Sequence, residues 1–357
     1  MLFRLALLAS WRLILMKHKL LNYLRCPSCA GAIRLASVAA TEAEEIMTGR
    51  LVCDSCAREF AIVRGVPRFA TPAELAAGEV DGADKAATAE NFGWQWQHFV
   101  QSDDRYADQF LGWIAPVRPE FFKDKLVLEG GCGKGRHTQL AASWGAREVI
   151  GVDLSDAVET AFAATRHLEN AHIVQADIYQ QPFAREFDYA FSIGVLHHLP
   201  DPRAGFRSLA GKVKAGGSLS AWVYGAENNE WITRFVDPLR EGFSSRIDRR
   251  ALLHLSKLPT AMMYLATKLV YGPLNRSHGG SRLARYLFYN DYLNAISHFG
   301  WREQHTIVFD HLVAPTSHYI RREDFEQWWQ DVAAADVIIG WHNKNSWRGV
   351  GKIGCGS

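Results

Sequence analysis

Apolar runs and amphipathic stretches alternate between residues 125 and 224, as they do in a parallel sheet covered by helices on both faces. The pattern predicts strands at 125–129, 148–153, 172–176, 187–192 and 217–224, and helices at 137–145, 155–168 and 202–213. Near the C-terminus it predicts a helix at 322–330 and a hairpin of strands 336–341 and 346–351 with its turn at 343–345. The predicted fold class is therefore α/β.

The pattern changes on the N-terminal side of this region. Residues 71–90 are rich in Ala, Gly, Glu and Asp without an apolar period, which predicts a mobile linker. Residues 91–122 are dense in aromatic side chains, and Phe92, Trp96 and Phe99 recur at helical spacing. This aromatic segment either packs onto the α/β domain or forms a lid over a ligand cleft.

About 95 residues, 226–320, separate the fifth strand from the last helix, and their apolar runs predict an inserted set of helices. Between residues 241 and 290 there are eight Arg or Lys residues against two acids, Glu241 and Asp248. This excess could meet an anionic acceptor, a phosphate-bearing lipid or a membrane surface, or it could form a solvated helical face.

Composition adds little to this picture. The chain has 357 residues, of which 48% are hydrophobic and 22% are charged, as in ordinary globular proteins. The net charge of +2 gives no support to nucleic-acid binding. A chain of this length has room for two domains, or for one domain with large insertions.

Four of the six cysteines form two CxxC pairs, Cys26/Cys29 and Cys53/Cys56. This spacing is typical of a metal site, and four sulfur ligands favour a structural zinc ion over a catalytic one, which keeps an open position. Residues 22–70 are too few for a substantial core, so zinc would hold this module together. Reduced cysteines predict a cytoplasmic protein.

Residues 1–21 form an N-terminal extension that contains an apolar run interrupted by Arg12. Three readings remain open for it. Translation could start at Met16, the segment could be a short amphipathic helix, or it could be a signal or anchor. The run is too short for a membrane span.

A ligand site is predicted where strand 125–129 enters a loop of alternating glycines. The loop runs Glu129, Gly131, Gly133, Gly135, and a helix begins after it. Two further acids, Asp153 and Asp177, end the next two strands, and successive acids are 24 residues apart. One acid can hold an ammonium group, the second a ribose diol and the third an adenine amino group. Together these groups describe S-adenosylmethionine.

A nicotinamide cofactor is the competing ligand for this loop. Its fingerprint, G-x-G-x-x-G, requires a glycine where this chain has Arg136. An NAD-dependent oxidoreductase therefore stays as an alternative, and so does a non-catalytic zinc-ribbon scaffold.

With the fourth-strand segment 187–199 added, residues 124–224 resemble class I S-adenosylmethionine-dependent methyltransferases of the methyltransferase-11/25 kind. Residues 22–70, which close with Gly65-Val66-Pro67, resemble the Trm112-like zinc ribbon that supports or activates methyltransferases. The resemblance implies a Rossmann-like, seven-stranded, mostly parallel sheet and a methyltransferase domain over 91–357. The implied cofactor-binding residues are Glu129, Gly131, Gly133, Gly135, Asp153, Leu154, Ala176, Asp177, Ile178, Ile193 and Gly194.

The insert 226–320 is expected to roof the acceptor site. Candidate catalytic residues, any one of which could take a proton from an oxygen acceptor, are His197, His198, His311, His318 and Tyr319. The sequence favours a small-molecule acceptor, such as a lipid- or glycan-type metabolite. The alternative is a tRNA or protein acceptor guided by the zinc ribbon.

Overall fold

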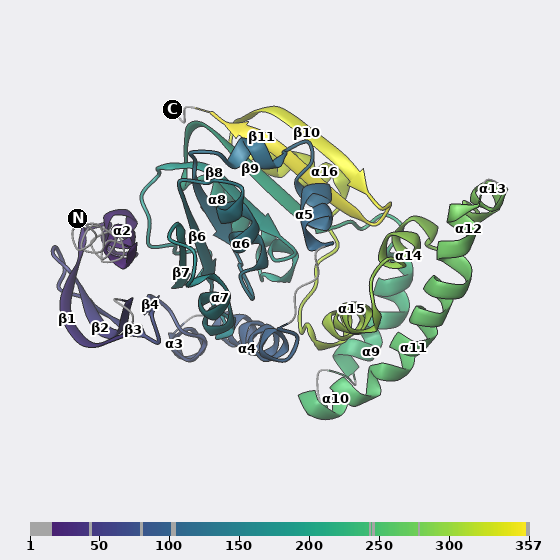
Figure 1. The fold of residues 1–357 in the computed structure, drawn as a ribbon, viewed down its shortest axis with the longest axis horizontal. Helices are drawn as coiled ribbons and strands as arrows, with labels where there is room; N and C mark the ends of the chain where they lie inside the picture. The colour runs from purple at the N-terminus through teal and green to yellow at the C-terminus, as the bar shows by residue number, and fades with distance from the viewer. Residues whose placement is uncertain are drawn as a thin grey trace, which may run out of the picture.

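All strands in the described part of the chain join in one sheet, in the order β1-β2-β3-β4-β7-β6-β5-β8-β9-β11-β10 (Figure 1). This computed structural model describes residues 16–42, 45–78, 81–100, 105–242, 244, 247–277 and 279–354. The strands are β1 (Ile33–Glu42), β2 (Glu45–Cys53), β3 (Glu59–Val63), β4 (Val66–Arg68), β5 (Leu126–Gly130), β6 (Glu148–Asp153), β7 (Ala171–Gln175), β8 (Phe187–Ile193), β9 (Val213–Tyr224), β10 (Ala334–His342) and β11 (Ser346–Ile353). Residues 1–15 lie outside the described residues, so the expectations for that stretch of the N-terminal extension stay untested.

Seven of these strands form the sheet that the sequence predicted. Strands β7, β6, β5, β8 and β9 are parallel, whereas β11 is antiparallel to both β9 and β10. The predicted strands, the last helix and the final hairpin all form within a few residues of their expected positions. The α/β fold class, with a mostly parallel seven-stranded sheet, is thus confirmed.

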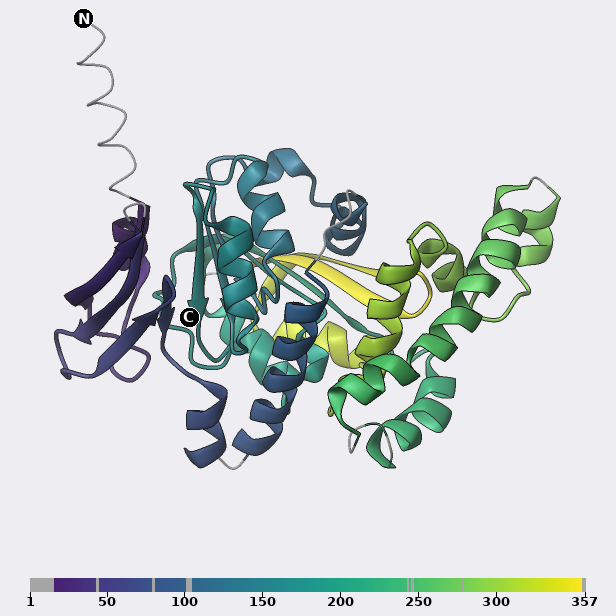
Figure 2. The ribbon, with the colours of Figure 1, turned by 60° about the horizontal axis from the view of Figure 1, so that its bottom comes forward.

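Helices cover both faces of the sheet, as Figures 1 and 2 show. One buried cluster joins α5 (Tyr106–Ile114) and α6 (Arg136–Ser143) to residues such as Val127 and Phe191, and the other joins α8 (Pro202–Ala210) and α16 (Arg322–Asp331) to residues such as Leu128 and Ala190. Residues on β5 thus alternate between the two faces, so the strand is apolar on both sides.

The zinc-ribbon segment extends this sheet and begins after α2 (Met16–Tyr23). Strand β4 pairs in parallel with β7 through Arg68 and Gln175, and the Phe69 amide donates to the Gln175 carbonyl at 2.8 Å. The ribbon lies at one end of the molecule and the helical insert at the other (Figure 1).

The sequence predicted a mobile linker at 71–90, but the described residues of this range form α3 (Pro72–Gly78) and the first half of α4 (Gly82–His98). The buried face of α4 is made of small residues, Gly82, Ala86, Ala89 and Gly93. A Cβ on Gly93 would lie 3.3 Å from the Asp156 amide nitrogen, so small residues let α4 approach the domain closely. A search for large apolar residues does not detect such a face.

The insert predicted at 226–320 forms helices beyond the end of β9 (Figure 2). They are α9 (Asp237–Gly242), α10 (Arg249–Leu255), α11 (Lys257–Ala266), α12 (Gly272–Arg276), α13 (Gly280–Ala284), α14 (Asn290–Ile296) and α15 (Trp301–Val313), with π-helical turns at Ile232–Val236 and Thr267–Tyr271. The remaining helix α7 (Ala157–Thr165) and the 3-10 turns Pro119–Phe122 and Leu196–His198 belong to the α/β domain. Among the described residues, we find no helix with the length and apolar content to cross a bilayer.

Candidate functional site

The glycine loop folds back over the carboxyl end of β6. The amides of Gly131 and Cys132 both donate to the Val152 carbonyl, at 2.7 and 2.8 Å. Gly131 has a φ of +81°, and a Cβ there would lie 2.3 Å from the Val195 side chain. Only glycine therefore allows this turn, which leaves the loop beside the end of β8.

Asp153 and Asp177 both reach this loop region, as expected from their positions at strand ends. The Asp153 carboxylate accepts from the Gly133 amide at 2.8 Å and from the Ser155 amide and hydroxyl at 2.9 and 2.6 Å. The Asp177 carboxylate accepts from Lys85 of α4 at 3.0 Å and from the Tyr179 amide at 3.0 Å. Burial raises the pKa of Asp153, while its hydrogen bonds oppose that rise.

A small cavity of about 150 Å³ lies between this loop and α4. Of the predicted cofactor-binding residues, nine line it: Gly131, Gly133, Asp153, Leu154, Ala176, Asp177, Ile178, Ile193 and Gly194. Its α4 side is formed by Lys85, Thr88, Ala89, Phe92 and Trp96. We call this space the donor cavity.

Glu129 and Gly135 do not line the donor cavity. Glu129 is 1% exposed, and its carboxylate accepts from the Thr138 hydroxyl and contacts His137 Nδ1 at 3.2 Å. Gly135 caps α6, and a Cβ there would lie 3.0 Å from the Cα of Ala161. These two residues hold α6 against the sheet, so their expected role in binding is not visible in their contacts.

Glu129 gives a pH-dependent stability that can be measured. Burial raises its pKa to about 8, from 4.5 in the unfolded chain. The fold therefore prefers the neutral acid, and stability that is present below pH 4.5 is lost as the pH rises toward 8. We expect Glu129→Gln to stabilise the ligand-free protein at pH 8 by up to roughly 4 kcal/mol, and to have no effect near pH 4.5. Urea unfolding at both pH values tests this, and equal midpoints at pH 8 would contradict it.

A larger cavity of about 650 Å³ lies between the α/β domain and the insert. Its walls carry many aromatic side chains, among them Trp96, Tyr106, Trp113, Trp222, Tyr224, Tyr289, Tyr292 and Tyr319. Arg105 and Arg136 supply positive charge, and Asp108, Glu303 and Asp310 supply carboxylates. We call this space the acceptor cavity.

Five residues line both cavities, and they mark where the cavities meet: Trp96, Arg136, Ile193, Gly194 and Asp310. The Arg136 guanidinium lies 4.6 Å from the Tyr106 ring centre and 5.5 Å from that of Trp113. Asp310 accepts from Gln95 at 3.1 Å and from the Tyr224 hydroxyl at 3.3 Å, and burial raises its pKa. A group carried in the donor cavity can therefore meet a second molecule in the acceptor cavity.

The five candidate catalytic residues are brought to one region but not to one cavity. His311 and Tyr319 line the acceptor cavity, and His198 lines the donor cavity. His197 and His318 line neither, although the His318 amide donates to the His197 carbonyl at 2.7 Å. Tyr224 stacks against His197 at 3.9 Å and against His311 at 5.5 Å between ring centres.

Burial lowers the pKa of all four histidines. The pKa of His198 falls to about 4, and that of His197 lies well below its ordinary value. The pKa values of His311 and His318 are also lowered, mainly by burial. These imidazoles are therefore neutral at pH 7, which is the form that can accept a proton.

Sequence reasoning missed Arg136 and Asp310 as site residues, together with the aromatic lining from β9 and α14, whereas Trp96, Tyr106 and Trp113 lie in the aromatic segment weighed as a lid. Arg136 was noted only as a departure from the nicotinamide fingerprint, and Asp310 lies just before the predicted His311. The aromatic lining comes from α5, β9 and α14, which are far apart in sequence. A local motif could not have indicated that these segments meet.

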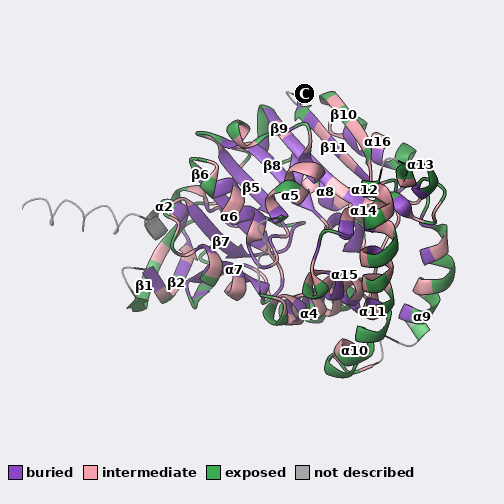
Figure 3. Cartoon of the chain, turned by 45° about the vertical axis from the view of Figure 1, so that its right-hand side comes forward, coloured by how far each residue is buried: buried purple, intermediate pink, exposed green. Residues whose placement is uncertain are grey.

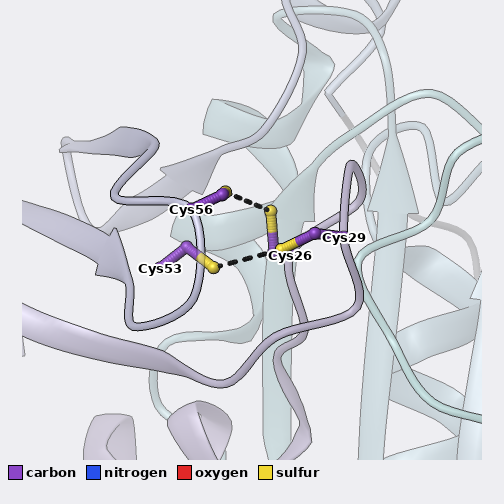
Figure 4. Close-up of side chains that lie close together, drawn as sticks. All are labelled: Cys26, Cys29, Cys53 and Cys56. Carbon is purple, nitrogen blue, oxygen red and sulfur yellow. Dashed lines mark hydrogen bonds between the residues drawn. The ribbon is translucent and has the colours of Figure 1, made fainter.

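The four CxxC cysteines come together in the ribbon (Figure 4). Their sulfur atoms all lie within 4.8 Å of one another, with Cys26–Cys56 at 3.7 Å and Cys29–Cys53 at 3.4 Å. A tetrahedral zinc ion with Zn–S bonds of about 2.3 Å needs sulfur atoms about 3.8 Å apart. The set therefore fits a structural zinc ion and leaves no open coordination position.

Two family models match separate parts of the chain. Residues 128–221 match a family described as a methyltransferase domain, and residues 17–65 match one described as Trm112p-like protein. The chain therefore joins a class I S-adenosylmethionine-dependent methyltransferase domain to an N-terminal Trm112-like module. The predicted domain class, its cofactor and the ribbon are confirmed.

Relatives that match at sequence level include tRNA U34 carboxymethyltransferases. That of Vibrio cholerae is 34% identical over 127 residues, which are 34% of this chain and 38% of the relative. That of Pseudoalteromonas translucida is 34% identical over 115 residues, 31% of this chain and 34% of the relative. The chain thus spans well under half the length of these relatives.

These relatives overturn the expectation of a small-molecule acceptor. That expectation relied on the net charge, which averages over the whole chain and conceals local basic surfaces. Enzymes named for a tRNA acceptor match about a third of this chain. The net charge therefore gives no ground for excluding nucleic acid as an acceptor.

Solved structures with related folds include a complex of the Haloferax volcanii Trm112 methyltransferase activator with a methyltransferase. It is 13% identical, covers 76% of this chain and 98% of that chain, and has a TM-score of 0.41. A methyltransferase from Mesorhizobium loti is 27% identical over 29% of this chain and 48% of that chain, with a TM-score of 0.27.

Proposed function

We propose that this protein transfers a methyl or substituted methyl group from an S-adenosylmethionine-type donor to a nucleotide of tRNA, in the cytoplasm. The observation that carries the proposal is the meeting of the donor and acceptor cavities at Arg136, Ile193 and Gly194. The names of the relatives supply the acceptor class.

The chain's own residues suit this donor. Asp153 would hold the ribose diol, Asp177 the adenine amino group, and the loop at Gly131 and Gly133 the amino-acid part. S-adenosylmethionine supplies an activated sulfonium carbon when bound. The donor cavity, at about 150 Å³, is smaller than typical ligand pockets of roughly 300 Å³ or more. Helix α4 would therefore shift on binding, and adenine would take the place of Lys85 at Asp177.

The acceptor cavity suits a nucleotide base that has left its stack. Aromatic walls bind an unstacked base through its π-face, and arginines hold adjacent phosphates. Tyr106 and Trp113 form one wall with Arg136 beside them, while Arg105 also lines the cavity. Burial around the junction excludes water from the reacting atoms.

The proton that an oxygen acceptor loses would go to His311. This imidazole faces the acceptor cavity and is neutral at pH 7, and the neighbouring Asp310 would stabilise the imidazolium that forms. His198 lies on the donor side, where Nδ1 is 2.8 Å from the Thr316 carbonyl oxygen. We assign His198 to shaping the donor cavity.

We expect His311→Asn to lower the single-turnover rate by about 100-fold, the lower end of general-base contributions, and to leave donor affinity unchanged. His318→Asn, which changes a histidine outside both cavities, serves as the matched control and should keep its rate. Because burial lowers the pKa of His311, the wild-type rate should stay level from pH 8 to 6.5 and fall below that range. An unchanged single-turnover rate in His311→Asn would show that His311 does not accept the proton.

The function is tested by incubating purified protein with S-adenosylmethionine, or its carboxylated analogue, and bulk tRNA, followed by mass spectrometry of the nucleosides. We expect one nucleoside to gain a methyl or carboxymethyl group, and Asp153→Ala to lose the product. Donor binding without any modified nucleoside would contradict the tRNA acceptor while leaving the donor assignment intact.

A further inference from the structure

The outer face of helix α11 is apolar although it faces solvent. Five large side chains from α10 to the turn after α11 are between 55% and 72% exposed: Leu255, Leu258, Met262, Leu265 and Leu269. Leu258, Met262 and Leu265 lie in α11, where their spacings of four and three residues place them within an arc of about 60° at 100° per residue. Leu255 is the last residue of α10, and Leu269 lies in the π-helical turn that follows α11. We call these five residues the α11 stripe; Figure 3 shows exposed residues along α10 and α11.

The inner face of the same segment carries buried polar side chains beside Met263, which packs against the cluster of Tyr106, Ile296 and Phe299. Ser256, Thr260 and Thr267 are at most 1% exposed. Ser256 bonds to His305 at 2.8 Å and Thr267 donates to Gln304 at 3.1 Å, both on α15. A helix that faces water normally has the opposite arrangement, with its apolar face inward. The large apolar side chains on the outer face of α11 therefore indicate that this face contacts an apolar partner when the protein functions.

The charge along the segment that carries the α11 stripe has one sign. From residue 249 to residue 290 the sequence contains seven Arg or Lys residues and no Asp or Glu. Five of these cations are exposed and form no ion pair with any described residue: Arg250, Lys257, Arg276, Arg282 and Arg285. The partner of this surface is therefore both apolar and anionic.

We propose that the α11 stripe docks onto an anionic lipid membrane, with the helix lying in the plane of the surface. Exposed leucines and methionine enter the acyl boundary, and the surrounding cations meet lipid phosphates. RNA is anionic too, but a row of aliphatic side chains offers it neither stacking nor hydrogen bonds. A second copy of the chain would bring the same cations together, which opposes pairing.

The test is vesicle flotation of the full-length protein with phosphatidylcholine alone and with phosphatidylcholine containing a quarter of phosphatidylglycerol. We expect binding to the anionic vesicles to be about tenfold stronger and to weaken with added salt. The variant Leu258→Gln/Met262→Gln/Leu265→Gln should bind about 100-fold more weakly, because three apolar side chains no longer leave water. Both proteins retain residues 1–15, so any contribution of that apolar segment cancels.

A matched control replaces three exposed apolar residues elsewhere, Val38→Gln/Val63→Gln/Ile338→Gln, and should bind vesicles like the wild type. Equal zinc content and donor affinity in all three proteins establishes that each is folded. The proposal is overturned if the wild type does not float with anionic vesicles, or if the stripe variant floats equally well. It is also overturned if the stripe variant loses tRNA binding or dimerisation instead of vesicle binding.

Discussion

Asp153→Ala is expected to weaken the binding of S-adenosylmethionine by about 100-fold. A carboxylate that accepts both hydrogen bonds of a ribose diol contributes about 3 kcal/mol, and about 1.4 kcal/mol corresponds to a factor of ten. The same carboxylate fixes the loop through the Gly133 amide and the Ser155 amide and hydroxyl. Equilibrium dialysis with labelled donor measures the change.

Asp153→Asn separates the two roles of this side chain. Its amide oxygen can still accept from Ser155, whereas the charge is lost, so its affinity should fall between those of wild type and Asp153→Ala. Asp124→Asn is the matched control, since Asp124 is exposed and has a φ of +59° that asparagine tolerates. Wild-type affinity in Asp153→Ala would mean that the donor binds elsewhere.

The second large effect is expected from the zinc ligands. Cys26→Ser/Cys53→Ser removes the two buried ligands, and the ribbon should then unfold, because zinc binding contributes on the order of 10 kcal/mol in modules of this size. Cys355→Ser changes a cysteine outside the four-sulfur set and serves as the control. Zinc content and circular dichroism report the loss.

Loss of zinc should also weaken binding of the donor. Arg68 of β4 donates to the Gln175 side chain, and Gln175 donates to the Leu154 carbonyl at 2.8 Å, next to Asp153. Couplings of this kind amount to roughly 0.5–2 kcal/mol, so donor affinity should fall by up to about tenfold. Unchanged donor affinity in a protein that has lost zinc would mean that the ribbon is independent of the donor site.

The sequence predicted those parts of the site that follow from local patterns. Asp153 and Asp177 end buried parallel strands, so their position at one sheet edge followed from the strand pattern alone. The two CxxC pairs likewise predicted that the four cysteines lie together, because the two-residue spacing within each pair is a local feature of the sequence.

Other parts depended on packing that no local pattern reports. Helix α4 packs closely on the α/β domain through glycines and alanines, and this packing brings Phe92 and Trp96 to the donor cavity. Glu129 lies under α6 because Thr138, nine residues later, donates to it. Asp310 reaches the junction only because α15 packs across the end of β9, where it meets Tyr224.

Calorimetric titration of the wild type with S-adenosylmethionine measures whether the cavity that Asp153 lines binds this donor. We predict binding of one S-adenosylmethionine per chain. At a hundredfold excess over the dissociation constant the ligand should stabilise the fold by about 2.7 kcal/mol. NAD should give neither heat nor stabilisation, because Arg136 stands where its fingerprint requires glycine. Binding of NAD without binding of S-adenosylmethionine would mean that the donor cavity holds a nicotinamide cofactor and that the methyl-donor assignment is wrong.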